Sequence, residues 1–445
     1  MGLKCTLYPT FRLQPGYIAN ILLGVARYLQ YRFDCLRSPT KWEPIQPEPN
    51  GYELAKKLLY LVERYTKIWK YDYIFVQILN ALSHVFLDID STNRLVFLLY
   101  LLVKHPNHQK KQELKNVEKN KEVTVSDIRS ESINSIKGIA AWSAIKLCNR
   151  LLKHNKDLPE LLFPLLSLYA RDPVESVRAA LMDDLPYLAQ KNYSWARQLF
   201  DTIFSDHQTH LWSIAERFMY YFYDDHFDHI SIYLDKMKEE STTECLNAWG
   251  RLITLVALSG HINQSELFKQ LETKNSIVAW EGACQVFSAN IDKQKHRKLC
   301  TNGITYILKL NQKSNRLLRI IEKTFELEKK SYCLDYNFAY LFIDAIEPGI
   351  QSFYFFFEWI ADLSHRDPIE ALSICEKFIQ KCFSDEFSYK LWGDKKLIDA
   401  LSNILREADE TDDEKLINRA VYLQDQFLRM DISGIEDFFE MAGRV

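Results

Sequence analysis

Glycine and proline are scarce in this sequence of 445 residues, which contains only 13 of each. A chain of this length at average usage would hold roughly 30 glycines and 20 prolines. Strand-rich folds need frequent glycine-containing turns, so this scarcity favours helices. Because a single compact core rarely grows beyond about 250–300 residues, the length indicates either several domains or a repeat array.

The sequence also lacks a charge excess of one sign. Its formal net charge is −3 and its pI is about 6.4. A nucleic-acid binder is expected to show a strong positive excess or a basic stripe, and neither is obvious here. Nucleic-acid binding is therefore the secondary interpretation.

Disulfide signatures, a signal peptide and long apolar runs are missing as well. The nine cysteines are thinly spread and form no Cys-x-x-Cys motif, a pattern typical of buried, reduced thiols. The first residues include no apolar run of the signal-peptide kind. The longest apolar run, Leu95 to Val103, is far shorter than the roughly 20 residues of a membrane span. We therefore expect a cytoplasmic protein without a membrane partner.

The sequence also lacks the common catalytic motifs. The chain contains no G-x-x-x-x-G-K-[ST] or G-x-G-x-x-G loop to cradle phosphate, and no G-x-S-x-G nucleophile elbow. The sequence predicts neither an enzyme nor a cofactor.

Helical periodicity dominates what is present. Val177, Leu181, Leu185 and Leu188 recur at helical spacing and share one face. The pattern predicts roughly sixteen to twenty helices of about 12–20 residues. One amphipathic pair cannot bury its apolar face, but stacked pairs form a continuous core. The predicted pairs are 158–171 with 174–191, 194–205 with 209–224, 226–239 with 243–259, and 263–272 with 275–291.

Composition suggests three regions. Residues 105–127 hold few apolar side chains and an excess of lysine, as in a flexible linker or a solvated helix. We expect an N-terminal helical region at 1–104, a charged linker at 105–127, and an all-α, HEAT-like solenoid of stacked helix pairs at 128–445.

Two predicted helix starts share the same sequence pattern. Asp172-Pro173-Val174-Glu175 and Asp367-Pro368-Ile369-Glu370 each follow an arginine. Both offer an N-cap acceptor, proline at the first helical position and glutamate at the third. Their separation of 195 residues predicts five units of 39, close to the HEAT period.

Histidines form two H-x-x-H pairs, His207 with His210 and His226 with His229. Residues three apart share a helix face, so the four could bind zinc or iron. The alternative is that both pairs lie at polar helix ends. We expect no metal and keep the four histidines as a weak candidate site.

Aromatic and basic side chains supply the candidate partner contacts. Most aromatic residues should fill helix seams, and those left exposed should anchor a partner, because Trp, Tyr and Arg dominate binding hot spots. The predicted partner-binding residues are Lys137, Trp142, Arg178, Trp195, Arg217, Tyr221, Trp249 and Arg251.

Three segments resemble a known family. The run Ile133-Asn134-Ser135-Ile136-Lys137-Gly138 is similar to an I-N-S-V-R-G signature, with Ile-Lys in place of Val-Arg. Segments 172–180 and 280–290 are similar to HEAT-like "DP-x-x-x-VR-x-A" and "GAA-x-V-x-A-N" elements. In this order, across roughly residues 85–385, they resemble the helical-repeat sensor regions of large bacterial STAND or NACHT-type ATP-binding proteins, including anti-phage defence proteins.

The resemblance implies a non-catalytic sensor array without the ATP-binding module that usually precedes it. The implied partner is a protein, either a phage protein or a separate NTPase or effector subunit. Three alternatives stay open: a nucleic-acid binder like the HEAT-like DNA glycosylases, a metal-dependent enzyme built on the four histidines, and a purely structural scaffold.

Overall fold

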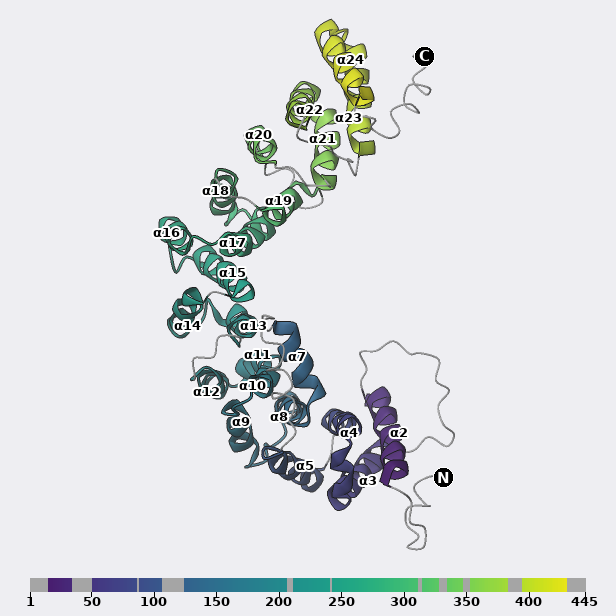
Figure 1. Ribbon diagram of the computed structural model, residues 1–445. Helices are drawn as coiled ribbons and strands as arrows, with labels where there is room; N and C mark the ends of the chain where they lie inside the picture. The colour runs from purple at the N-terminus through teal and green to yellow at the C-terminus, as the bar shows by residue number, and fades with distance from the viewer. Residues whose placement is uncertain are drawn as a thin grey trace, which may run out of the picture. The chain divides into compact units, whose positions relative to one another are not determined.

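A computed structural model describes residues 15–33, 50–85, 88–105, 124–205, 211–240, 242–310, 314–327, 334–346, 353–382 and 394–429. Within these ranges every regular element is a helix, which confirms the predicted all-α solenoid of stacked helix pairs (Figure 1). The described residues form 22 α-helices, more than the sixteen to twenty predicted. No helix of these ranges has both the length and the apolar character needed to cross a bilayer.

The chain divides into two compact units, residues 1–222 and 223–445. In unit 1 the helices fall into two layers. One layer consists of α2, α4, α8, α10 and α13, each packed on the next, and the other of α3, α5, α9 and α12 (Figure 1). The elements of unit 1 are α2 (Pro15–Phe33), α3 (Gly51–Arg64), η1 (Thr66–Lys70), α4 (Asp72–His84), α5 (Ile89–Leu102), α7 (Val125–Asn134), α8 (Ile136–Lys153), α9 (Leu162–Ala170), α10 (Glu175–Met182), α11 (Leu185–Lys191), α12 (Tyr193–Ile203) and α13 (Trp212–Phe222).

Unit 2 repeats the two-layer plan with more regular pairs. In each pair the first helix belongs to one layer (α14, α16, α18, α20, α22) and the second helix to the other (α15, α17, α19, α21, α23). Its elements are α14 (Phe227–Glu239), α15 (Thr243–Ser259), α16 (Gln264–Lys274), α17 (Ile277–Asn290), α18 (Arg297–Leu308), α19 (Asn315–Glu322), η4 (Lys323–Phe325), α20 (Tyr336–Asp344), α21 (Tyr354–Arg366), α22 (Pro368–Cys382), α23 (Asp394–Thr411) and α24 (Glu414–Arg429).

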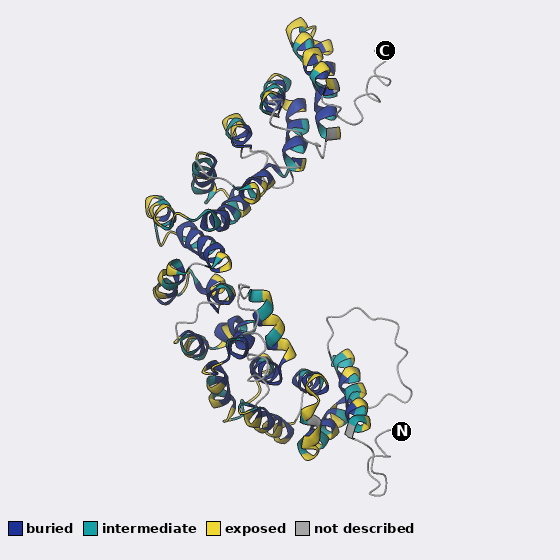
Figure 2. Ribbon diagram, viewed as in Figure 1, coloured by how far each residue is buried: buried dark blue, intermediate teal, exposed yellow. Residues whose placement is uncertain are grey.

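The second helices carry most of the core. Figure 2 shows α15 and α17 buried around much of their circumference, whereas α14 and α16 keep an exposed face. Most rings of the aromatic run at 353–359 lie in the core, although Tyr354 is exposed: Phe356 and Trp359 are buried, and the ring centroid of Phe325 lies 4.8 Å from that of Phe356. Burial of such large apolar side chains between pairs is the main driving force for stacking.

Predicted helix pairs agree best where capping residues are clear. The pairs α14/α15 and α16/α17 lie within two residues of prediction. Asn263 accepts a hydrogen bond from the Glu266 amide (2.9 Å), and Gly260 ends α15 with a φ of 93°. Glycine adopts this left-handed conformation without steric cost. Local capping chemistry therefore fixed these boundaries.

One predicted helix is wrong. The segment 174–191 is not continuous, because α10 ends at Met182 and α11 begins at Leu185. Pro186 occupies the start of α11. It has no N–H for an intrahelical bond, so it favours a new helix start at this point.

The two Asp-Pro starts also differ, which overturns the predicted period. Asp367 caps α22, since its Oδ1 accepts from the Glu370 amide (3.1 Å). Asp172 instead accepts from the Val174 amide (3.0 Å), and α10 begins only at Glu175. Moreover, α22 is the first helix of its pair, whereas α10 follows α9 as the second helix of its pair. The 195 residues therefore do not span a whole number of pairs, and five units of 39 is wrong.

The division into compact units falls away from the predicted linker. It lies between Phe222 and Tyr223, while α4 and α5 both pack on α8 across the 105–127 segment. The end of that segment is already helical, because α7 begins at Val125. Residues 106–123 lie outside the described ranges.

Candidate functional site

Three of the predicted partner-binding residues are buried, so that prediction is wrong for them. Trp249 is fully buried in α15, and Arg178 is 1% exposed in α10. Lys137 is buried in α8, where its Nζ lies 2.5 Å from the carboxylate of Asp172. Side chains inside the repeat core hold helices together and have no surface for a partner.

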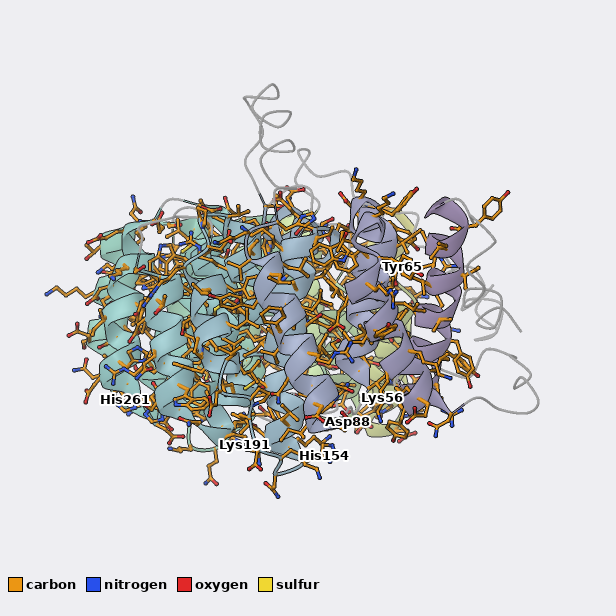
Figure 3. All side chains as sticks on the ribbon, turned by 90° about the horizontal axis from the view of Figure 1, so that it is seen from below. Lys56, Tyr65, Asp88, His154, Lys191 and His261 are labelled. Carbon is orange, nitrogen blue, oxygen red and sulfur yellow. The ribbon has the colours of Figure 1, made fainter. Side chains whose placement is uncertain are left out.

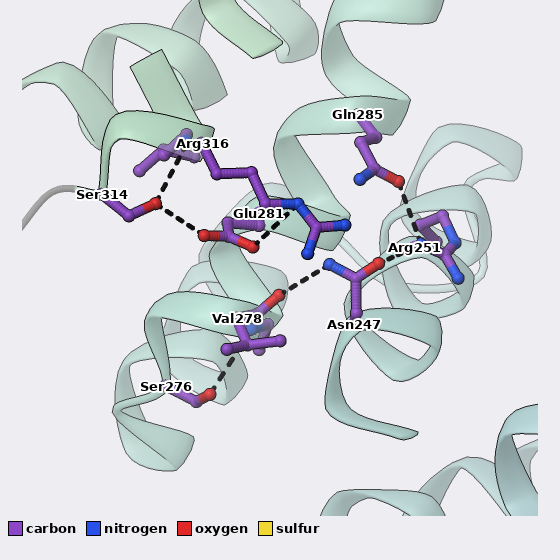
Figure 4. A network of polar contacts seen from close by, with 10 residues as sticks. Asn247, Arg251, Ser276, Val278, Glu281, Gln285, Ser314 and Arg316 are labelled. Carbon is purple, nitrogen blue, oxygen red and sulfur yellow. Dashed lines mark hydrogen bonds and ion pairs between the residues drawn. The ribbon is translucent and has the colours of Figure 1, made fainter. Parts of the chain in front are cut away.

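Two further candidates are half-buried and occupied within the chain. The Trp195 ring packs on Phe163 of α9, with ring centroids 4.8 Å apart. Arg251 donates to the Oδ1 of Asn247 and to the Oε1 of Gln285, the latter over 3.0 Å (Figure 4). Both side chains stabilise seams between neighbouring helix pairs.

The seam that contains Arg251 also holds a longer polar network (Figure 4). Asn247 Nδ2 donates to the Val278 carbonyl (3.1 Å), which ties α15 to the start of α17. Glu281 of α17 accepts from Ser314 Oγ (2.6 Å) and forms an ion pair with Arg316 (3.5 Å) at the start of α19. Both α15 and α17 therefore hold the N-terminus of the next second helix.

Two glycines let α15 and α17 touch through their backbones. A Cβ on Gly250 would lie 2.0 Å from the Ala279 carbonyl oxygen, and a Cβ on Gly282 would lie 2.1 Å from that of Asn247. No larger residue fits at either position without shifting a helix. Gly282 belongs to the 280–290 motif that carries the family resemblance, so this motif residue has a packing role here.

The first resemblance motif is explained in the same way. Ser135 caps α8 by accepting a hydrogen bond from the Gly138 amide (3.1 Å). A Cβ on Gly138 would lie 2.1 Å from the Ser132 carbonyl oxygen of α7. Together with the buried Lys137, these residues build the α7–α8 corner and are not a partner surface.

The remaining candidates, Trp142, Arg217 and Tyr221, meet at a pocket in unit 1. Arg217 and Tyr221 of α13 line it, and Trp142 lies beneath one of its lysines. The pocket has a volume of about 660 Å³ and lies between the C-terminal parts of α2, α4, α8 and α13, the start of α3, and α11. This volume is within the ~300–1,000 Å³ typical of ligand-binding pockets. We call it the basic pocket.

Positive side chains outnumber negative ones in the basic pocket. Lys146, Arg150 and Lys153 come from one face of α8, at spacings of four and three, and Arg217 faces them from α13. Two carboxylates, Asp183 and Asp184, share the lining. Tyrosines complete the walls: Tyr52, Tyr187 and Tyr221.

Lys146 is held in place by its neighbours. Its Nζ lies 3.9 Å from the centroid of the Trp142 ring and donates to His84 Nε2 over 2.9 Å. The cation–π contact and the hydrogen bond together position the ammonium group. Burial lowers the pKa of Arg150 to about 10, which leaves the guanidinium protonated at neutral pH.

The acidic side of the basic pocket is built into the fold. Asp183 forms ion pairs with Arg129 (3.2 Å) and with Arg217 (3.7 Å). Burial raises the pKa of the Asp184 carboxyl. The Asp184 carbonyl accepts from Asn149 Nδ2 over 2.8 Å, which fixes the break between α10 and α11 against α8.

A second pocket of about 630 Å³ adjoins the basic pocket and shares Tyr52 and His154 with it. Lys56 and Asp88 form an ion pair in its wall (2.6 Å). That contact lowers the pKa of Asp88. Figure 3 shows Lys56, Asp88 and His154 close together at one edge of the protein. The two pockets are therefore neighbours along the helix ends, with Tyr52 and His154 in the walls of both, and we call them together the edge groove.

Sequence reasoning missed the three basic residues of α8. A signal was available, because Trp142, Lys146, Arg150 and Lys153 follow one another at spacings of four, four and three. That spacing places one aromatic and three cationic side chains on a single helix face. Read together with Arg217 and Tyr221 at i and i+4, it indicates a basic surface with aromatic residues.

The histidine pairs do not form a metal site in the described part of the chain. His207 and His210 lie outside it. His229 is buried in α14, with its ring against Tyr233 (centroids 5.3 Å apart), and His226 immediately precedes that helix. Across the described ranges, no three His, Cys, Asp or Glu side chains gather closely enough to bind a metal ion.

Comparisons with known proteins add little. No family model matches the chain, and no curated protein is similar to it. Among solved structures, it is similar to a circular tandem repeat protein with novel repeat topology and enhanced subunit contact surfaces. The two chains share 11% identity over 97% of this chain and 99% of that chain, with a TM-score of 0.23. A TM-score this low carries no argument about fold or function.

Proposed function

We propose that this chain is a non-catalytic protein-interaction array that binds a protein partner through the edge groove of unit 1. The single observation behind the proposal is the basic pocket, where side chains from six helices form a concave surface with a net positive lining. Repeat arrays commonly present extended surfaces of this kind to protein partners.

The lining chemistry supports a protein ligand. Interface hot spots are enriched in Tyr, Trp and Arg that cluster in partly desolvated pockets. In the basic pocket Arg217 and Tyr221 are exposed, while Lys146 and Arg150 are half-buried. Such a mixture provides both anchoring area and charge recognition.

The resemblance to STAND and NACHT-type sensor regions supports a more specific role. On that basis we propose a cytoplasmic sensor in bacterial antiviral defence, whose partner is a phage protein or a separate NTPase or effector subunit. The catalytic module would then belong to another protein.

The test is affinity capture with the full chain as bait, from phage-infected and from uninfected bacterial cells. A double variant, K153E/R217E, reverses two charges of the basic pocket. The matched control, K295E/K298E, makes the same charge change at exposed positions of unit 2. We expect one specific protein that the wild type and the control recover and the pocket variant loses. Capture of no specific protein under either condition would contradict the proposal.

Nucleic-acid binding is the second candidate, because cations interleaved with tyrosines also suit a phosphate backbone with stacked bases. It predicts DNA or RNA affinity that falls steeply with salt. Electrophoretic mobility shifts with single-stranded and duplex DNA at two salt concentrations distinguish it from the protein-binding proposal.

A further inference from the structure

We infer that the basic pocket recognises an acidic peptide segment of the partner, with its Asp or Glu side chains paired to Lys146, Lys153 and Arg217. This inference rests on the proposed function, since it names the chemistry by which that interaction array would select its partner. Three properties of the basic pocket support it: the charge of its lining, its shape, and its poor fit to a competing polyanion.

Charge comes first. Four cationic side chains face two carboxylates in the lining, and one of these, Asp183, is already paired with Arg129 outside the pocket. Arg217 lies 3.7 Å from the same carboxylate, too far for a short hydrogen bond. An incoming carboxylate would therefore find Arg217 and the exposed Lys153 on opposite walls, with Lys146 between Trp142 and His84 below.

Shape is the second step. The basic pocket and the adjoining pocket share Tyr52 and His154 in their walls, so a ligand that occupies both must be extended. Tyr52 and Tyr221 are 47% and 50% exposed, which leaves apolar ring faces available along the path. Tyrosine rings bury large area at a low cost in conformational entropy, as in other peptide-binding surfaces.

The competing polyanion is nucleic acid. Its backbone offers one phosphate after another and hydrogen-bond acceptors only, so it needs a long row of cations. Here the two carboxylates Asp183 and Asp184 interrupt the cationic lining, and the whole chain has a net charge of −3. A peptide has backbone N–H donors as well as carboxylates, so it can satisfy both signs of charge in the same pocket.

The experiment uses the full chain and a short fluorescein-labelled peptide rich in glutamate, monitored by fluorescence anisotropy. The matched probe is the same peptide with glutamine at every glutamate, and a labelled single-stranded DNA is the third probe. Each probe is titrated with wild type, K153E/R217E and K295E/K298E. Circular dichroism melting of the three proteins establishes that the variants remain folded, and K153Q/R217Q replaces the reversal variant if that one is unfolded.

We expect the glutamate peptide to bind wild type at least about ten-fold more tightly than the glutamine peptide. The pocket variant should lose about ten-fold or more of that affinity, and the control variant should stay within about two-fold. Equal binding of both peptides, or equal loss in both variants, overturns the inference. Tighter binding of DNA than of the glutamate peptide, with the same dependence on Lys153 and Arg217, overturns it in favour of nucleic acid.

Failure of the acidic-peptide inference can be distinguished from failure of the proposed function. If the affinity capture recovers a specific partner that K153E/R217E binds as well as wild type, the interaction array stands and the acidic-peptide site is wrong. If the glutamate peptide binds through the basic pocket but capture recovers no specific protein, the pocket chemistry stands and the proposed cellular role is wrong.

Discussion

Unit 1 and unit 2 use the polar side chains of their second helices in different ways. In unit 2 these side chains bond to the next helix pair: Asn247 to Val278, Glu281 to Ser314, and Glu322 to the Phe355 amide. In unit 1 Asn149 makes the equivalent contact to Asp184, but Lys146, Arg150 and Lys153 on the same helix line an open pocket. Stacking needs only a few polar contacts per helix pair. The additional cationic side chains of α8 in unit 1 therefore mark the candidate site.

The largest effect is expected at the buried ion pair of unit 1. Replacing Lys137 by Met leaves the Asp172 carboxylate, 3% exposed, without its partner. We expect the free energy of unfolding to fall by about 4 kcal/mol, because an uncompensated charge remains buried. Urea denaturation measures this loss.

The control is K56M, which removes the ion pairs of the half-exposed Lys56 with Glu53 and Asp88. It should change stability little, because solvent screens exposed pairs. Equal losses in the two variants would contradict the assignment of Lys137 to the core.

A slightly smaller effect is expected from the close helix contact of unit 2. Gly282→Ala would place a Cβ 2.1 Å from the Asn247 carbonyl oxygen, so α15 and α17 must move apart. We expect a loss of about 3 kcal/mol in a thermal melt. Gly24→Ala in α2 is the matched control, since its new Cβ meets nothing within 4 Å. There the higher helix propensity of alanine should leave stability equal or raise it by about 0.5–1 kcal/mol.

The third prediction concerns pH and the contact between α19 and α21. Burial raises the pKa of Glu322 to about 7, from a usual value near 4.5, although two backbone amides donate to it. Between these values the folded state holds a proton that the unfolded state has released, so stability falls as pH rises from about 4.5 to above 7. The expected loss is on the order of 3 kcal/mol.

Glu322→Gln should remove this pH dependence and be more stable than wild type at pH 8, as measured by urea denaturation across the pH range. Glu239→Gln, at an exposed position of the same unit, should keep the wild-type slope. If E322Q also keeps the wild-type slope, Glu322 is not the group responsible.

The smallest effect on stability is expected at the basic pocket itself. Arg217→Gln removes an exposed cation whose nearest carboxylate is 3.7 Å away, so the free energy of unfolding should change by less than about 0.5 kcal/mol. Binding of the glutamate peptide should nevertheless weaken. A large loss of stability in R217Q would place Arg217 among the stacking contacts and remove the contrast between the two units.

Much of the fold is predictable because its boundaries are local. Gly260 signals the end of α15 and Asn263 the start of α16, both through capping chemistry alone. The break before α11 was missed because the apolar positions 177, 181, 185 and 188 continue through it in phase, and periodicity outweighed the proline at 186.

The site was less predictable, because periodicity does not show which face meets the neighbouring pair. Arg178 and Trp249 look like binding residues in sequence, yet both are buried inside the repeat core. The burial of Lys137 depends on Asp172, a partner 35 positions away that no local pattern reveals. By contrast, the spacing of Lys146, Arg150 and Lys153 was visible in the sequence but was not recognised.

The two glycines between α15 and α17 also bear on how unit 2 responds to force. Because the two backbones are in direct contact, little compressible side-chain volume lies between the helices, and this junction should be stiff. The junction around Phe325 is filled by aromatic side chains instead, such as Phe356, whose ring is tilted by 70° from that of Phe325. If unit 2 bends on partner binding, we expect α15 and α17 to move together as one rigid body.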